Sequence, residues 1–486
     1  MVQKMLKIIK IFLISFILND VAYASGGEKI KDIERVKQSI VTINSRVSVS
    51  AYQNTGSWSG TGFIADLEKG FIVTNNHVVG RAAVGTYFIT FYNGQQAEAK
   101  VVYYDQYADF AILKINPEEL PSQVGKIEFS AKEPVIGDEV FIVGNTEDQG
   151  FSFHNGYLSD LFDISGQMPQ GSYVINMNST GGASGSPVLN SESKAIGVLY
   201  GGGKTHALAL KSSYVTDVLN GLKDNKLPQR KHIGVISALY SLDKAVKHRN
   251  FPTAEMISYI KKFPNARNRI ITARSIISGS TAQGIIMPGD IIWAVNSKEL
   301  GGDLTILDQA MNSAKDTITL TIFRDGKKLD KEVKLYDLEE TKIRKILDFA
   351  GAIFFEVDDY AAAKSGIPIG SVAIANVQTG SSFSSIPEMF IQNYKSVYRL
   401  VVESMNNQKI ETLDELVKVT NNAIKQKFIN ITYKNYQPYF ALFDQESGFI
   451  SSQEQLMQDI TFDSIDTKPR ILRYDETVNE WISEEV

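Results

Sequence analysis

The sequence contains no cysteine among its 486 residues. Disulfide bonds, a thiol nucleophile and cysteine-based zinc sites are therefore excluded, and no cofactor or metal is predicted. Without disulfides the fold must be stabilised by apolar cores. A chain of this length is expected to form roughly three domains.

Runs of basic residues are absent as well. The 50 lysine and arginine residues are outnumbered by 55 aspartate and glutamate residues, which gives a formal net charge of −5 at pH 7. A mildly acidic chain without basic runs lacks the electrostatic footprint of a nucleic-acid-binding protein. Nucleic acid is therefore not predicted as a partner.

Long apolar runs are scarce, and the clearest one covers only residues 8–18 (IIKIFLISFIL). Three lysines lie within the first ten residues, and Ala22-Tyr23-Ala24 follows the run as a small-x-small cleavage site. These are the three parts of a secretory signal peptide, whereas a membrane anchor needs about 20 apolar residues. Residues 1–24 are therefore predicted to be a signal peptide, and the exported chain is predicted to be soluble.

Histidine occurs five times, and the stretch Met177 to Asn190 (MNSTGGASGSPVLN) places Ser184 among glycines. A nucleophilic serine needs a sharply bent backbone, because its hydroxyl and the amide donors for the oxyanion must face one small space. Gly182 and Gly185 supply that freedom. Glycine and serine also cluster in ordinary turns, so this stretch needs partners elsewhere in the chain.

A serine hydroxyl becomes a good nucleophile when a histidine takes its proton and a carboxylate orients that histidine. His77 follows the strand-like run Phe71 to Val73, and Asp109 stands at the start of another such run, DFAILK. The chain order His77, Asp109, Ser184 is that of the trypsin-like double-barrel proteases and differs from the subtilisin and α/β-hydrolase orders.

Four blocks of sequence resemble the HtrA/Deg family of trypsin-like serine proteases: TNNHVV, DFAILK, GDEVFIVGN and GASGSPV. The resemblance covers about residues 35 to 225. It implies that Ser184 is the nucleophile, His77 the general base and Asp109 the orienting acid. The amides of Gly182 and Ser184 would form the oxyanion hole.

The same resemblance implies a periplasmic, ATP-independent serine endopeptidase that acts on unfolded or damaged proteins. It also implies a homo-oligomer, a trimer or a multiple of it, assembled through the protease domains. Small or medium apolar side chains are implied next to the scissile bond.

Two residues depart from the common Gly-Asn-Ser-Gly-Gly-Pro block, namely Ala183 and Ser186. Ala183 cannot pair with a newly cut amino terminus, so activation by that route is excluded. The two departures also leave open a second hypothesis, in which a protease scaffold that no longer cuts serves as a chaperone or peptide-binding module.

Short apolar runs separated by Gly, Asn and Asp turns fill residues 41 to 220, a pattern typical of an all-β barrel or sandwich. Residues 25–225 are therefore assigned to the protease domain, whose family fold is a double β-barrel. The first barrel would carry His77 and Asp109, and the second would carry Ser184.

Residues 230–336 resemble a PDZ domain. Pro288-Gly289-Asp290 predicts a tight turn into the strand IIWAV. The next segment predicts a helix with one apolar face, made of Leu304, Leu307, Ala310 and Met311. Asp325-Gly326 predicts a hairpin turn. PDZ domains add an extended C-terminal peptide to a sheet edge. The segment after His232, with Ile233, Gly234 and Val235, is expected to bind the peptide carboxylate. The alternative is a domain that only packs on the protease.

The segment that begins at Val295 recurs in weakened form at Met405. Residues 346–437 are therefore predicted to be a degenerate second PDZ-like domain, the last of two α+β domains, with a scaffolding role. A short charged helix is expected at 341–347 and a C-terminal extension at 438–486. One hypothesis is that the terminal Val486 docks into a PDZ groove, and the other is that the tail is solvated.

Overall fold

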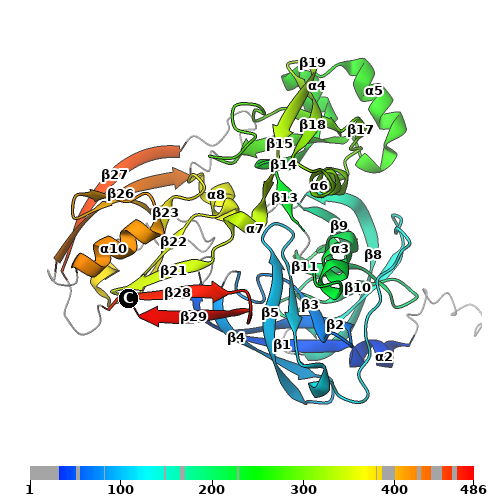
Figure 1. Cartoon of the computed structure of the whole chain (residues 1–486). Coiled ribbons are helices and arrows are strands. Elements are labelled where there is room, and N and C mark those ends of the chain that lie inside the picture. Colours follow the sequence, from blue (N-terminus) through cyan, green and yellow to red (C-terminus); the bar gives the residue numbers. More distant parts are fainter. Residues whose placement is uncertain are drawn as a thin grey trace, which may run out of the picture.

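The computed structural model describes residues 32–50, 55–81, 83–146, 149–164, 170–226, 229–378, 380–385, 400–423, 428–438, 451–461 and 468–485 (Figure 1). The predicted signal peptide and Val486 lie outside the described residues. The described residues contain no helix that is both long and apolar enough to cross a bilayer.

The first barrel closes in the strand order β1-β2-β3-β6-β5-β4. Its strands are β1 (Ile40–Ser50), β2 (Gly56–Asp66), β3 (Phe71–Thr74), β4 (Ala83–Phe91), β5 (Gln96–Asp105) and β6 (Phe110–Lys114), with α2 (Ile33–Gln38) before them and the short 3-10 helix η1 (Pro117–Glu119) after them. All four residues of β3 are buried, and inward and outward positions alternate along much of β1. This alternation is the period-2 pattern of a strand with one face in a core.

The second barrel closes in the order β10-β11-β12-β9-β8-β7. It consists of β7 (Glu139–Thr146), β8 (Gln149–Ile164), β9 (Gly171–Asn176), β10 (Pro187–Leu189), β11 (Ala195–Gly202) and β12 (Ala207–Lys211), and α3 (Ser212–Lys223) follows it. The predicted double β-barrel is confirmed, and further domains rich in β-strands follow it.

The second domain has a sheet in the order β14-β15-β16-β18-β19. Its elements are β13 (Lys231–His232), β14 (Val235–Ser241), α4 (Leu242–Arg249), α5 (Thr253–Lys262), η2 (Pro264–Ala266), β15 (Arg269–Ile276), β16 (Ile291–Val295), β17 (Lys298–Glu299), α6 (Leu304–Ser313), β18 (Thr317–Arg324), β19 (Lys327–Lys334), β20 (Tyr336–Asp337) and α7 (Leu338–Thr341).

Local chemistry explains the elements of the second domain. Asp325 and Gly326 both have positive φ in the turn between β18 and β19, as a two-residue type I′ hairpin requires. The Asp303 side chain accepts a hydrogen bond from the Thr305 amide and so caps α6. On the predicted apolar face of α6, Leu304, Leu307 and Met311 are buried and Ala310 is half-buried.

The third domain has a sheet in the order β27-β26-β24-β23-β22-β21-β28-β29. Its elements are β21 (Lys345–Phe349), β22 (Ala352–Glu356), α8 (Asp359–Ser365), β23 (Val372–Val377), η3 (Ser382–Ser385), β24 (Leu400–Met405), β25 (Gln408–Lys409), α10 (Leu413–Ala423), β26 (Phe428–Pro438), β27 (Ser451–Thr461), β28 (Arg470–Asp475) and β29 (Glu480–Glu485).

Two expectations about the third domain are wrong. The helix expected at 341–347 ends at Thr341 as α7, and β21 begins at Lys345 because this segment pairs with β22 and β28. The extension expected from residue 438 is not a separate tail. Its strands β28 and β29 lie in the sheet of the third domain, where Ile471 and Leu472 are buried.

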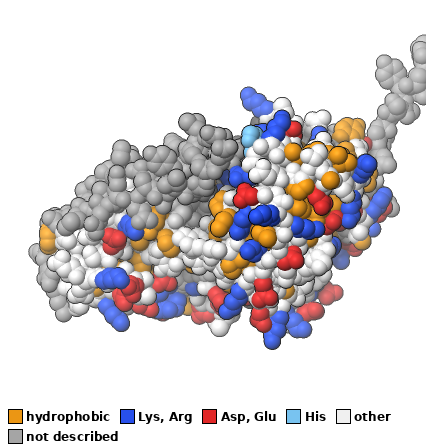
Figure 2. Space-filling model, turned by 90° about the horizontal axis from the view of Figure 1, so that it is seen from above, with side chains coloured by type: hydrophobic (Ala, Val, Ile, Leu, Met, Phe, Trp, Pro, Cys, Tyr) orange, Lys and Arg blue, Asp and Glu red, His pale blue; other side chains and the backbone are white. Residues whose placement is uncertain are grey.

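Seen from above, the described part of the surface carries interspersed acidic and basic side chains, without a large region of one sign (Figure 2). The described residues on this face therefore form no extended positive surface of the kind that follows a nucleic-acid backbone.

Candidate active site

The barrel topology explains why His77 and Asp109 meet. β3 and β6 are antiparallel neighbours, with Thr74 opposite Ala111. His77 lies three residues after the end of β3, and Asp109 comes immediately before β6. Because the end of one strand adjoins the start of the other, the two side chains lie at the same edge of the first barrel.

The two side chains form a double contact. His77 Nδ1 lies 2.8 Å from Asp109 Oδ2, and the His77 backbone N–H donates to Asp109 Oδ1 at 3.0 Å. The Asn75 side chain donates to the Asp109 carbonyl at 2.9 Å. Asp109 is buried, while the His77 side chain is 29 % exposed. This arrangement fixes the imidazole and leaves part of it open to a substrate.

The charge on Asp109 is set by opposing effects. Burial disfavours its ionised form, but the Arg81 guanidinium and His77 together hold the pKa of the Asp109 carboxyl below its usual value. Arg81 Nη2 lies 3.4 Å from Asp109 Oδ1. The carboxylate is therefore ionised at neutral pH, as stabilisation of a transient imidazolium requires.

Ser184 lies in a tight turn before β10 of the second barrel. Gly182 and Gly185 both have positive φ, at 86° and 89°. A Cβ on Gly185 would lie 2.0 Å from the Thr61 carbonyl oxygen, so only glycine fits there. Glycine is thus needed around the serine for two reasons: the positive φ of Gly182 and Gly185, and the short distance from Gly185 to the Thr61 carbonyl oxygen.

Strand β2 of the first barrel braces this turn. The Thr61 amide donates to the Ser184 carbonyl at 2.9 Å, and Thr61 Oγ1 donates to the Gly182 carbonyl at 2.8 Å. Among the hydrogen bonds of the described residues, none uses the backbone N–H of Gly182 or of Ser184. The two amides are therefore not engaged by the described residues, and their role as oxyanion donors stays a prediction.

The two departures from the common serine block have structural roles. The Ser186 hydroxyl is fully buried and donates to the Ala183 carbonyl at 2.6 Å. Ala183 packs in the apolar core of the second barrel, where an unpaired acid would be unfavourable. Both residues support the turn that carries Ser184.

Three residues around this site were not anticipated. Thr61 and Arg81 connect segments that are distant in the sequence, and no local pattern marks such contacts. The Ser186 hydroxyl spans only three residues, to the Ala183 carbonyl, but its bracing role was not expected from the sequence. The two asparagines of the motif TNNHVV were a local sign of such contacts. Asn75 and Asn76 are buried, and their side chains donate to the backbone carbonyls of Asp109 and Asp105.

The segment expected to bind a peptide carboxylate leads into β14. Ile233 and Val235 are buried. The Gly234 amide, which was expected to face the carboxylate, donates to His232 Nδ1 at 3.1 Å. Peptide binding by these residues stays a prediction, and in this structure His232 occupies one of the expected donors.

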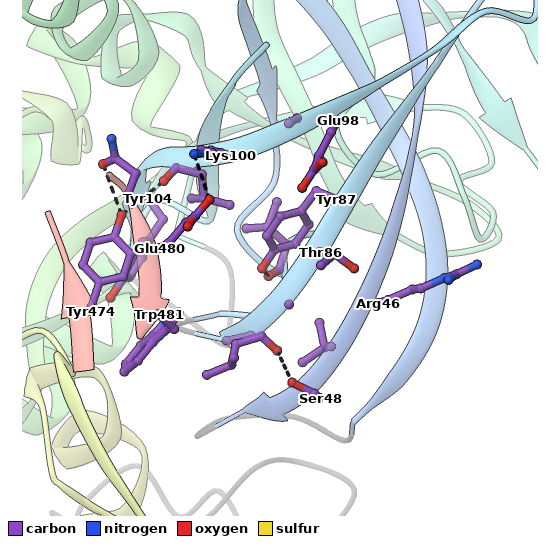
Figure 3. A pocket seen from close by; sticks show the side chains of 18 of the residues that line it. Arg46, Ser48, Thr86, Tyr87, Glu98, Lys100, Tyr104, Tyr474, Glu480 and Trp481 are labelled. Carbon is purple, nitrogen blue, oxygen red and sulfur yellow. Dashed lines mark hydrogen bonds and ion pairs between the residues drawn. The ribbon is translucent and has the colours of Figure 1, made fainter. Parts of the chain in front are cut away.

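A cavity of about 640 Å³ lies between the first barrel and the β28–β29 hairpin (Figure 3). Arg46, Tyr87, Tyr104, Tyr474 and Trp481 are among its lining residues, and none of the predicted catalytic residues lines it. The cavity therefore belongs to a domain interface and not to the candidate active site. In the described part of the chain, no group of three or more His, Asp or Glu side chains is placed to hold a metal ion.

Comparison with known proteins agrees with this geometry. Residues 60–198 match the family model of the trypsin-like peptidase domain. An uncharacterised protein of Rickettsia prowazekii, RP187, is 48% identical over 190 residues, which are 39% of this chain and 97% of that protein.

A second curated relative is the pro-apoptotic serine protease NMA111 of Candida glabrata. It is 25% identical over 404 residues, 81% of this chain but 39% of that protein, so the chain spans about two fifths of its length. Among solved structures, a serine endoprotease from Yersinia pestis is 20% identical, with a TM-score of 0.42 over 63% of this chain and 98% of its own. The chain therefore carries a trypsin-like peptidase domain, and the motifs of this domain resemble those of the HtrA-type serine proteases.

Proposed function

We propose that the chain is an exported serine endopeptidase that cleaves unfolded or damaged polypeptides through an acyl-enzyme. The observations that carry the proposal are the hydrogen-bonded His77–Asp109 pair of the first barrel and a serine turn that Thr61 of the same barrel braces. The two predicted oxyanion donors of this turn have no hydrogen-bond partner among the described residues.

In the acylation step, the Ser184 hydroxyl oxygen attacks the scissile carbonyl carbon while His77 takes the hydroxyl proton. The amides of Gly182 and Ser184 bind the resulting oxyanion, and each such donor contributes roughly 3 kcal/mol to the lowering of the barrier. The C–N bond then breaks, and His77 returns the proton to the departing amine. Water, activated in turn by His77, hydrolyses the ester and regenerates the serine.

Two further parts of the proposal concern location and assembly. The signal-peptide pattern of residues 1–24 supports export to the periplasm with cleavage after Ala24. The family resemblance supports a homo-oligomer, a trimer or a multiple of it. N-terminal sequencing of the protein recovered from the periplasm, and its mass in solution by light scattering, test these two parts separately.

The choice of substrate is supported by the architecture. β14 is the outermost strand of the second-domain sheet as described, and such an edge pairs with an extended peptide. We propose that C-terminal peptides of partly unfolded proteins bind there. Titration with a fluorescent peptide that ends in an apolar residue tests this contact.

The decisive experiment compares residues 25–486 with the Ser184→Ala variant in degrading casein. Removal of a triad serine lowers turnover by about a millionfold, so the variant should have no detectable cleavage. A serine-directed covalent probe should label the parent and not the variant. Equal and negligible cleavage by both proteins, together with no labelling, would instead support the non-cleaving scaffold hypothesis.

A further inference from the structure

Helix α8 of the third domain lies at the end of that domain that faces the rest of the molecule (Figure 1). Its N-cap residue, Asp358, accepts a hydrogen bond from Gln106 Nε2 at 2.6 Å. Gln106 belongs to the short loop between β5 and β6 that ends in Asp109. Both Gln106 and Asp358 are at most 2 % exposed, so the helix packs directly on the loop that carries the predicted catalytic acid.

The first turn of α8 also reaches the loop that carries His77. The Tyr360 hydroxyl accepts a hydrogen bond from Arg81 Nη1 at 2.8 Å, and the Arg81 guanidinium carbon lies 5.5 Å from the centre of the Tyr360 ring. Tyr360 is 5 % exposed. A buried hydrogen bond and a cation–π contact thus hold one arm of the guanidinium.

The other arm of the same guanidinium faces the active site, because Arg81 Nη2 lies 3.4 Å from Asp109 Oδ1. A guanidinium is planar and rigid, so fixing one of its nitrogens fixes the direction of the others. The contacts therefore run without a break from Tyr360 through Arg81 to Asp109, and from Asp109 to His77.

We propose that Tyr360 is a positioning residue of the active site, which holds Arg81 against Asp109 and thereby makes the third domain part of the machinery that orients His77. The inference rests on the proposed serine peptidase function, and it assigns to the third domain a role beyond scaffolding.

Titratable and charged groups from both domains surround this series of contacts. His77 and Arg81 face Asp109 from its own barrel, and Tyr360 and Lys364 approach it from α8. Burial, with the positive charges of Arg81 and Arg274, lowers the pKa of Lys364 to about 8. The negative charge of Asp358 lies nearby and acts on the Tyr360 hydroxyl.

Loss of the Tyr360 hydroxyl would remove the hydrogen bond that holds Arg81 Nη1. The positive charge that helps to keep the pKa of Asp109 low would then be held less closely, so the carboxylate would take up a proton at a higher pH. The acidic limb of the pH profile should therefore move toward neutral pH, which a purely structural contact would not cause.

The test compares Tyr360→Phe with Tyr474→Phe. Tyr474 of β28 also donates its hydroxyl across the interface of the first barrel and the third domain, to the Val101 carbonyl at 3.2 Å. It lines the interface cavity (Figure 3), and Asp109 is not among the residues that line this cavity. Tyr360→Phe should lower kcat about tenfold with little change in KM and should shift the acidic limb upward. Tyr474→Phe should change neither.

Two variants of Arg81 sharpen the result. Arg81→Met should lower kcat by about a hundredfold, because misplacement of a catalytic group by about 1 Å has effects of that size. Arg81→Lys keeps the positive charge but lacks the planar guanidinium that contacts two partners, so its kcat should lie between those of Arg81→Met and the parent. Thermal unfolding of each variant establishes that the fold is intact.

The outcomes separate this inference from the proposed function. If the parent protein cleaves casein and Ser184→Ala does not, but Tyr360→Phe keeps both kcat and the pH profile of the parent, the positioning role is refuted. Equal losses in Tyr360→Phe and Tyr474→Phe would also refute it, in favour of general docking. Failure of the parent protein to cleave would refute the proposed function itself.

Discussion

The second and third domains share one order of elements but differ at the edge of the sheet and in their contacts with the protease barrels. In the second, β16, β17, α6 and β18 follow one another, and β16 pairs with both β17 and β18. In the third, β24, β25, α10 and β26 repeat the order, and β24 pairs with both β25 and β26. The helices match as well, since Leu413 and Leu416 of α10 are buried like Leu304 and Leu307 of α6.

The two domains differ at the edge of the sheet. In the second domain β14 is the last strand on its side of the described sheet. In the third domain the corresponding strand, β22, pairs with β21, and β28 and β29 extend the sheet beyond it. Strand addition needs an unpaired edge. In the third domain β21 lies beside β22, in the position that a peptide would take beside β14 in the second domain.

The attachments to the protease barrels differ too. Arg230 lies just before β13 of the second domain, and its Nε contacts Asp105 at 2.9 Å in a buried pair. The third domain instead contributes an exposed pair, Lys100 with Glu480 at 2.8 Å, besides the buried contacts of α8. The second domain is thus attached through a buried ion pair, whereas the third is attached through an exposed ion pair and the buried hydrogen bonds of Asp358 and Tyr360.

The largest effect is expected at Arg230. Arg230→Met leaves Asp105 buried without its cation and also removes the positive charge 3.8 Å from Asp308. Removal of one partner from a buried ion pair lowers the free energy of unfolding by about 3–5 kcal/mol. Urea unfolding at pH 7 measures the change.

The matched control is Lys100→Met in the exposed pair, with an expected loss below about 1 kcal/mol. Equal losses in the two variants would show that the second and third domains do not differ in how charge attaches them.

A smaller effect is expected at His232, where the second and third domains meet. Burial, and the nearby charge of Arg230, lower the pKa of His232 to about 3. Tyr107, Tyr336 and Asp359 also face the ring, and burial raises the pKa of the Asp359 carboxyl well above its usual value. Between about pH 6.5 and pH 3, His232 is therefore unprotonated in the folded protein but protonated in the unfolded chain. Its contribution to the free energy of unfolding is lost progressively as the pH drops through this range.

Between pH 7 and pH 5 this linkage removes about 2 kcal/mol from the free energy of unfolding. The His232→Asn variant should lose correspondingly less over the same interval, while His248→Asn, on the exposed side of α4, should behave like the parent. Urea unfolding at the two pH values measures the difference, and parallel behaviour of all three proteins would contradict the assignment.

The smallest effect concerns the sheet edge. Ala310 is half-buried on α6, the helix expected to face a peptide bound along β14. Ala310→Glu places a negative charge there and should weaken binding of a peptide with an apolar C-terminus at least tenfold, about 1.4 kcal/mol. Fluorescence anisotropy measures the affinity.

Gln309→Glu adds the same charge one residue earlier, at an exposed position, and should leave the affinity unchanged. If both variants bind the peptide like the parent, the peptide binds elsewhere and the difference between the two sheet edges has no bearing on recognition.

Local patterns in the sequence predicted much of this molecule. The tight turns at Gly289 and Gly326, the apolar face of α6 and the approach of His77 to Asp109 each depend on a few neighbouring residues or on the pairing of two adjacent strands. These features carry their information within short stretches, so they could be predicted from the sequence.

The parts that were missed depend on contacts across long separations. β28 joins β21 because Ile471 and Leu472 complete an apolar core, but their short run resembles many others in the chain. The contact of Arg81 with Tyr360 joins residues 279 positions apart. Neither residue stands in a motif, so only the folded structure brings them together.

The pairing of β21 with β28 also bears on the order of folding. Lys345 faces Arg473, about 130 residues later, and ribosomes add roughly 5–20 residues per second, so the second neighbour of β21 arrives several seconds after the strand itself. Contacts of such sequence separation form slowly because a long loop must close first. The barrels can therefore be complete while the third-domain sheet is still unfinished, and the interface with α8 is expected to be among the last parts of the molecule to mature.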